Sequence, residues 1–156
     1  MTEIDYDDGE KYINDESIEL AWAIKAAERA NVHMNLICAC NTKILRLNKA
    51  QDQIVKAFRE HFPSLDVRKV TEKELKDDGN KEKWRAFCEL FQESVEDYSM
   101  GTLLRIEAKY AYSPENTVVA PRIIFLAIES ARNIEGINEE CKASYTAHHK
   151  TVEQSF

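Results

Sequence analysis

The clearest hydrophobic pattern in the chain lies in residues 81–98, KEKWRAFCELFQESVEDY. Its large apolar side chains recur at intervals of three and four residues, which is the period of one helix face. They are Trp84, Phe87, Cys88, Phe91, Val95 and Tyr98. An aromatic stripe at this spacing is typical of a buried helix face. We therefore expect a helix over 81–98 that packs this stripe into the core.

The period changes to two after Gly101. Leu104 and Ile106 fall on one side of an expected strand over 102–112, and Arg105 and Glu107 fall on the other. The turn residues SPEN then lead into a second short apolar segment over 117–120. The pattern predicts an antiparallel hairpin with an exposed polar face that includes Arg105.

The least polar segment is TVVAPRIIFLAIESARN, residues 117–133. Pro121 suits the first position of a helix, because the N–H that proline lacks would have no helical partner there. Beyond Arg122 the apolar side chains point nearly all round, which predicts a central helix that starts near Ala120. Glu129 and Arg132 form an i,i+3 pair on the remaining polar side. The helix is expected to end at Asn133 to Gly136.

The rest of the chain has weaker periodicity. It predicts helices over 15–30, 32–38 and 48–61, a strand over 65–70, a short helix capped by Thr71 and Glu74, and a turn over 77–80. In the first of these helices the apolar residues lie on two sides. That pattern leaves open whether the helix is sandwiched or offers Trp22 to a partner.

These elements predict an α+β fold, a mostly helical single domain with a small antiparallel hairpin packed against helices. The domain is expected over 15–137. We expect a polar, acidic leader over 1–14 to be disordered. We expect a polar tail over 138–156 to be frayed.

Charge is unevenly distributed along the chain. The net charge is −7, and residues 1–19 hold eight acids against one base, while the remaining 20 acids and 20 bases cancel. Nucleic-acid binders need a basic stripe, so direct nucleic-acid binding is not expected. A basic protein partner matches the leader better, although the leader can equally be a solvated tail.

A membrane association is not expected either. Residues 118–128 are about half of the ~20 apolar residues that a membrane helix needs, and Arg122 interrupts them. The acidic start also differs from the basic start of a signal or transit peptide. A cytoplasmic location is expected, and a nuclear one stays open.

Motifs for catalysis and cofactors are missing. The four glycines are not clustered, which excludes G-x-G-x-x-G and phosphate-loop signatures. Cys38-Ala-Cys40 is not the C-x-x-C spacing of metal or redox sites, and the four histidines stand outside any catalytic motif. We expect no enzyme, no metal and no cofactor; an active site built from Arg105, Glu129 and Arg132 is the alternative left open.

Five segments together resemble a known family. They are IELAWAIKAAERA, DQIVKAFREHF, EKWRAFCELF, VEDYSMGTLLRIEA and YSPENTVVAPRIIFLAIESARNIEG. Over about residues 18–137 they are similar to the eukaryotic polysaccharide-biosynthesis-domain-containing protein family. The family name points to sugar methyltransferases, which the missing glycine-rich turn does not support.

The resemblance instead implies a dedicated, ATP-independent chaperone of translation elongation factor 1-alpha. Such a chaperone binds the nascent or unliganded GTP-binding domain of that factor until GTP binds. We also expect a monomer, and association with the ribosome stays open. A methyltransferase-like protein and a non-catalytic interaction scaffold are the alternatives.

We predict the client surface on the polar face of the hairpin and around it. The predicted contact residues are Arg105, Asn116, Arg122, Glu129, Arg132 and Asn133, with Trp84 and Arg85 as a second patch. The alternative is that these residues hold the fold. If they contact the client, charge reversal at Arg105 or Arg132 weakens capture with little loss of thermal stability; a large fall in melting temperature indicates a structural role.

Overall fold

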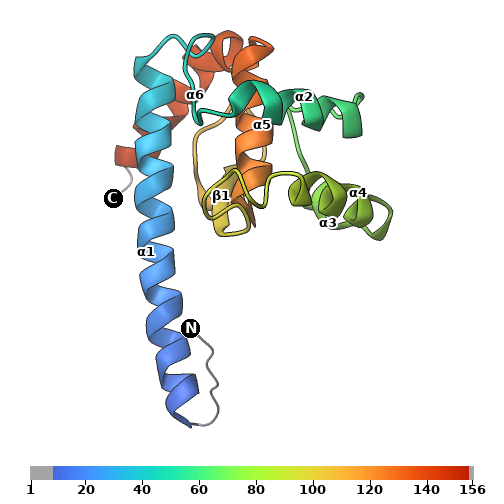
Figure 1. Ribbon diagram of the computed structural model, residues 1–156. Helices are drawn as coiled ribbons and strands as arrows, with labels where there is room; N and C mark the ends of the chain where they lie inside the picture. Colours follow the sequence, from blue (N-terminus) through green and yellow to red (C-terminus); the bar gives the residue numbers. More distant parts are fainter. Residues whose placement is uncertain (1–8, 155–156) are drawn as a thin grey trace.

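The computed structural model describes residues 9–154 and confirms the predicted α+β class (Figure 1). Its elements are the helices α1 (Gly9–Ala39), α2 (Gln51–His61), α3 (Glu72–Lys76), α4 (Asp78–Glu89), α5 (Arg122–Ile134) and α6 (Ile137–Gln154), the strands β1 (Gly101–Arg105) and β2 (Thr117–Pro121), and a 3-10 turn (Pro114–Asn116). None of the helices in this part of the chain is long and apolar enough to cross a membrane.

Helix α5 is the central element, as the sequence predicts. It packs against α2, α6 and both strands (Figure 1), and most of its side chains are buried. Pro121 precedes the helix rather than occupying its first position, because its ψ of 147° is extended. The predicted start near Ala120 is therefore corrected to Arg122. Gly136 has a φ of 83° just after the helix, a conformation that glycine adopts without steric cost.

The hairpin is confirmed but shorter than predicted. β1 and β2 pair antiparallel from Gly101 opposite Pro121 to Arg105 opposite Thr117. Residues 106–112 turn away instead of continuing the strand. The predicted strand over 65–70 is also wrong: this segment makes a single bridge between Lys69 and Glu107 and is otherwise irregular.

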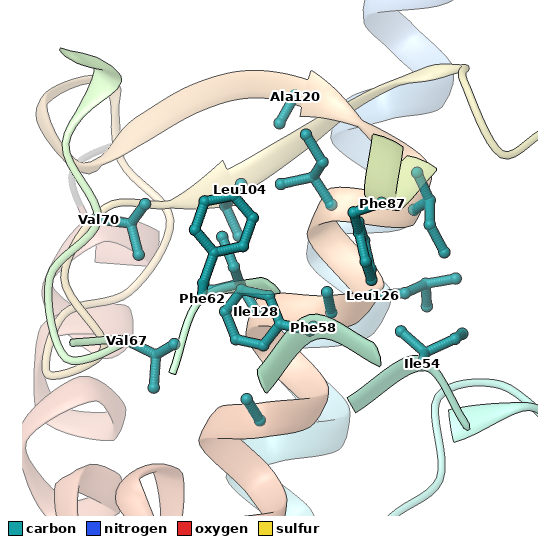
Figure 2. Packing of buried hydrophobic residues seen from close by; sticks show 14 of the residues in the cluster. Ile54, Phe58, Phe62, Val67, Val70, Phe87, Leu104, Ala120, Leu126 and Ile128 are labelled. Atoms are coloured by element: carbon teal, nitrogen blue, oxygen red, sulfur yellow. The ribbon is translucent and has the colours of Figure 1, made fainter. Parts of the chain in front are cut away.

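The main core lies between α2, α4, α5 and the hairpin (Figure 2). Phe62 and Trp84 stack with ring centroids 4.1 Å apart, and Phe87 is fully buried. The predicted aromatic stripe is thus in the core. The helix that carries it differs from the prediction, because α4 begins at Asp78, where a turn was expected, and ends at Glu89. Phe91 and Val95 are buried from the turns that follow.

Two corrections concern the ends of the domain. α1 is one continuous helix, with no break near residue 31; residues 9–14, expected in the leader, belong to it, and residues 1–8 lie outside the described residues. The expected frayed tail forms α6 as far as Gln154. Tyr145 of α6 is fully buried and donates a hydrogen bond of 2.6 Å to the carbonyl of Ile37. α6 is therefore an integral helix that packs on α1 and α5.

Candidate functional site

Three of the predicted site residues form a buried ionic cluster. Glu129 accepts hydrogen bonds from Arg105, at 2.9 and 3.0 Å, and from Arg132 at 2.9 Å. All three side chains are fully buried. The i,i+3 pair of Glu129 and Arg132 is confirmed, but it lies in the interior and not on a polar surface.

The cluster holds two guanidinium groups against one carboxylate, and backbone carbonyls and the amide oxygen of Asn138 supply further acceptors. Arg105 donates to the carbonyls of Ala108 and Tyr110 and to the amide oxygen of Asn138, at 2.8–3.0 Å. Arg132 donates to the carbonyls of Val67 and Ile106, at 2.7 and 2.9 Å. Buried charges are tolerated when they are paired and hydrogen-bonded in this way. The cluster also ties the irregular segments 65–70 and 106–112 to α5.

The environment of the cluster shifts the pKa of two neighbouring groups. Burial alone would raise the pKa of Glu129, but the two guanidiniums outweigh it and hold that pKa well below its usual range. Burial lowers the pKa of His33 to about 4, although Glu129 acts in the opposite direction. His33 is therefore neutral at neutral pH. Its 4.0 Å distance to Glu129 is not an ion pair there, and its Nδ1 lies 2.9 Å from the hydroxyl of Tyr112.

The other predicted contact residues have mostly structural positions. Asn116 is buried and bonds the backbone of Glu107 and Ala111, which fixes the hairpin loop. Trp84 is a core residue, and Asn133 is buried beside Asn138. Arg122 is half-buried and donates to the carbonyl of Glu96 at 2.5 Å.

Arg85 alone among the eight predicted residues is exposed, and its charged neighbour is Glu82, at 3.5 Å. The expected polar face of the hairpin therefore does not exist as a surface. Alternation assigned Arg105 to solvent, whereas the chain turns after β1 and the side chain enters the interior.

Two apolar pockets lie beside α1 and the hairpin. The α1–α5 pocket, of about 440 Å³, is bounded by Val32, Leu36, Leu103 and Phe125, with Arg122 at its rim. The α1–α6 pocket, of about 620 Å³, is bounded by Ala27, Asn31 and Met34 of α1, by Leu103, by the segment 112–117, and by the end of α6. Both pockets fall in the size range of ligand or side-chain binding sites.

Sequence reasoning missed this surface, although its signal was present. The apolar residues on two sides of the first helix left a partner contact open, with Trp22 as the candidate. Trp22 is in fact half-buried against the hairpin, and its Nε1 donates to the carbonyl of Gly101 at 3.0 Å. The exposed large apolar residues of α1 are instead found on both sides of Trp22 in the sequence: Ile18, Leu20, Ile24, Val32 and Leu36.

Metal binding finds no support in residues 9–154. No group of three or more His, Cys, Asp or Glu side chains there lies close enough to hold a metal ion. The four cysteines are free thiols. The candidate site therefore consists of the buried ionic cluster and of the apolar, pocketed surface beside α1.

Comparisons with known proteins give a consistent result. Residues 18–143 match the family model described as PBDC1 protein. Protein PBDC1 of Mus musculus is 49% identical over 135 residues, which are 86% of this chain and 68% of the mouse protein. Protein PBDC1 of Homo sapiens is 47% identical over 130 residues, 83% of this chain, and the chain spans only 56% of the human protein.

A solved structure is similar as well. The solution NMR structure of protein yst0336 from Saccharomyces cerevisiae matches with a TM-score of 0.74 and 39% sequence identity. The match covers 82% of this chain and 90% of the yeast chain.

Proposed function

We propose that this chain, which belongs to the PBDC1 protein family, is an ATP-independent chaperone of translation elongation factor 1-alpha. It holds the nascent or unliganded GTP-binding domain of that factor until GTP binds. The observation that carries the proposal is the exposed apolar wall of the α1–α5 pocket. Val32 is 59% exposed and Leu36 37% exposed, although both are large apolar residues on an ordered helix.

The pocket has the make-up of a protein-binding site. Its lining includes the apolar Leu103, Phe125 and Leu126, and the charged Glu28, Arg29 and Arg122 lie at its more exposed positions. An apolar centre with a charged, solvated rim is the usual arrangement of a protein interface. An incompletely folded client exposes apolar side chains that such a pocket can cover. Shielding them reduces the exposed apolar surface of both partners.

Release requires only a difference in affinity. If the chaperone binds the unliganded domain more tightly than the GTP-bound domain, GTP shifts the client toward the free, folded state. No nucleotide hydrolysis by the chaperone is needed. The proposed client is made in the cytoplasm, so the proposal implies a cytoplasmic location and a role close to synthesis.

The experiment compares client capture by the wild type and a Val32→Ser/Leu36→Ser double variant. The tagged chain is mixed with newly translated elongation factor 1-alpha, recovered, and washed with or without GTP. Wild type should retain the factor and lose it with GTP. The double variant should retain at most about a tenth of the factor that the wild type retains, because two apolar anchors are removed.

The matched control is Ile44→Ser. Ile44 is 77% exposed and lies outside both pockets, so its loss removes an apolar side chain elsewhere. Capture by the control should equal that of the wild type. Absence of captured factor with the wild type contradicts the chaperone proposal. Equal capture by all three proteins would instead reject the pocket as the contact surface.

A further inference from the structure

The N-terminal half of α1 has a second unusual surface. In Figure 1 this half extends beyond the rest of the described chain. Leu20, Ile24 and Glu28 follow one another at four-residue intervals along it, so they form one row on the helix. Leu20 is 64% exposed and Ile24 is 51% exposed. We call these three positions the α1 row.

The α1 row is separate from the surface that holds α1 to the body. The body contacts run mainly through buried residues on another side of the helix: Ala26, Ala30, His33 and Ile37. A projecting helix with apolar side chains in water gains little from packing. Packing within the fold therefore does not account for the exposed side chains of Leu20 and Ile24, whereas contact with a partner would.

The row leads directly into the α1–α6 pocket. Ala27 and Asn31, which lie one turn further along the same side of α1, form part of the wall of that pocket. The exposed Ala23 and Ala27 lie beside the row, and small residues of this kind let a second helix approach closely. From position 20 to position 28 the row is about 12 Å long, which matches roughly two turns of a partner helix.

Charge identifies the kind of partner. The acidic Glu28 ends the row, and Glu153 contributes to the wall of the α1–α6 pocket into which the row leads. Residues 1–19 carry a net charge of −7. The basic residues of this part of α1, Lys25 and Arg29, lie on the other side of the helix, and Arg29 lines the α1–α5 pocket.

This distribution disfavours other occupants. A second copy of the chain would bring two acidic segments together, which is repulsive. Nucleic acid and anionic membranes would be repelled for the same reason. A basic polypeptide is attracted to the row and gains affinity from its apolar pair.

We propose that the α1 row and the α1–α6 pocket form a docking trough for a basic amphipathic helix of a protein partner. The apolar face of that helix covers Leu20 and Ile24 and extends into the pocket. Its Lys and Arg residues lie over Glu28 and Glu153. The trough adjoins the α1–α5 pocket and shares Glu28 and Leu103 with it, but Leu20 and Ile24 lie outside that pocket, so this inference stands apart from the proposed chaperone function.

The test uses a labelled, 15-residue peptide of Leu and Lys arranged with helical period, and measures fluorescence anisotropy with the full chain. Two control peptides replace every Lys by Glu, or keep the composition but scramble the period. Wild type should bind the first peptide, more weakly as salt rises. It should bind neither control measurably.

The chain itself offers a matched pair of variants. Leu20→Ser/Ile24→Ser should weaken peptide binding roughly tenfold or more, because it removes the apolar anchors. Ile44→Ser removes an exposed apolar residue that lines neither the trough nor the α1–α5 pocket and should leave peptide binding unchanged. Since all three residues are exposed, circular dichroism should show both variants folded.

Three results would overturn the inference. The first is equal peptide binding by wild type and Leu20→Ser/Ile24→Ser. The second is equal binding of the Glu peptide. The third is sedimentation of the wild type as a dimer that the same double variant abolishes, which would make a second copy the occupant. None of these outcomes depends on capture of elongation factor 1-alpha, so the two proposals fail separately.

Discussion

Replacement of Glu129 by glutamine is expected to destabilise the fold strongly. The side chain is fully buried and accepts hydrogen bonds from two guanidinium groups at 2.9–3.0 Å. Glutamine keeps the shape but removes the only carboxylate that contacts Arg105 and Arg132 within the described structure. With His33 neutral, the formal charge of the cluster rises from +1 to +2 in the interior. Removal of one partner from a buried ion pair costs about 3–5 kcal/mol.

The assay is thermal and urea unfolding at neutral pH. For a chain of this size, each kcal/mol lowers the melting temperature by roughly 2–4 °C, so Glu129→Gln should melt roughly 6–20 °C below wild type. Glu82→Gln is the matched control. Glu82 pairs with Arg85 at the same i,i+3 spacing as Glu129 with Arg132, but at 3.5 Å and in solvent. Its replacement should change stability by less than about 0.5 kcal/mol.

The pH dependence gives an independent check. The native pKa of Glu129 is depressed below its ordinary value of 4.5, so its contribution to stability is complete above that pH and is lost progressively below it. The difference in stability between wild type and Glu129→Gln should therefore shrink as the pH falls below 4.5. A loss under about 1 kcal/mol at neutral pH, or a difference that grows in acid, refutes the assignment of Glu129 as the counter-charge.

Three further predictions concern other parts of the fold. The native pKa of His33 is about 4 against an ordinary 6.5, so the free energy of unfolding should fall by roughly 3 kcal/mol as the pH falls from 6.5 to 4. In urea unfolding, the stability of His33→Phe should depend less on pH over that range. Thr71→Ala removes the capping box with Glu74 and should cost about 0.5–2 kcal/mol in urea unfolding. Tyr145→Phe removes the bond to the Ile37 carbonyl and should cost about 1–3 kcal/mol in the same assay, whereas an unchanged midpoint would show that water replaces the hydroxyl.

The parts of the fold that the sequence predicts correctly have local causes. The periodicity of residues 122–134 predicts α5 and its central place, and the Thr71 and Glu74 pair predicts the capped start of α3. α6 could also have been found. Ile137, Cys141 and Tyr145 recur at four-residue intervals, but the polar residues between them favoured a frayed tail.

The parts that it mispredicts depend on distant partners. Arg105 alternates with apolar neighbours as an exposed strand residue would, and no local feature shows that Glu129, 24 positions later, neutralises it. The same holds for residues 65–70 and 106–112. The carbonyls of Val67, Ala108 and Tyr110 accept hydrogen bonds from Arg132 and Arg105, and the two segments are joined by one bridge, Lys69 with Glu107, and not by a longer ladder. A strand-like pattern therefore ends as largely irregular chain. A local sequence pattern does not show whether a backbone carbonyl will pair in a sheet or accept a hydrogen bond from a distant arginine.

The position of the ionic cluster also changes what the family resemblance can say about function. The segment that carries the resemblance most strongly, residues 112–136, includes Asn116, Glu129, Arg132 and Asn133, all of which are buried. Each of these residues has at least one hydrogen-bond partner inside the fold, so a change at one of them leaves another group unsatisfied. The distinctive residues of the segment therefore reflect mutual constraints within the interior. A variant at Glu129 tests the fold, whereas variants at Val32 or Leu20 on exposed α1 test what the chain binds.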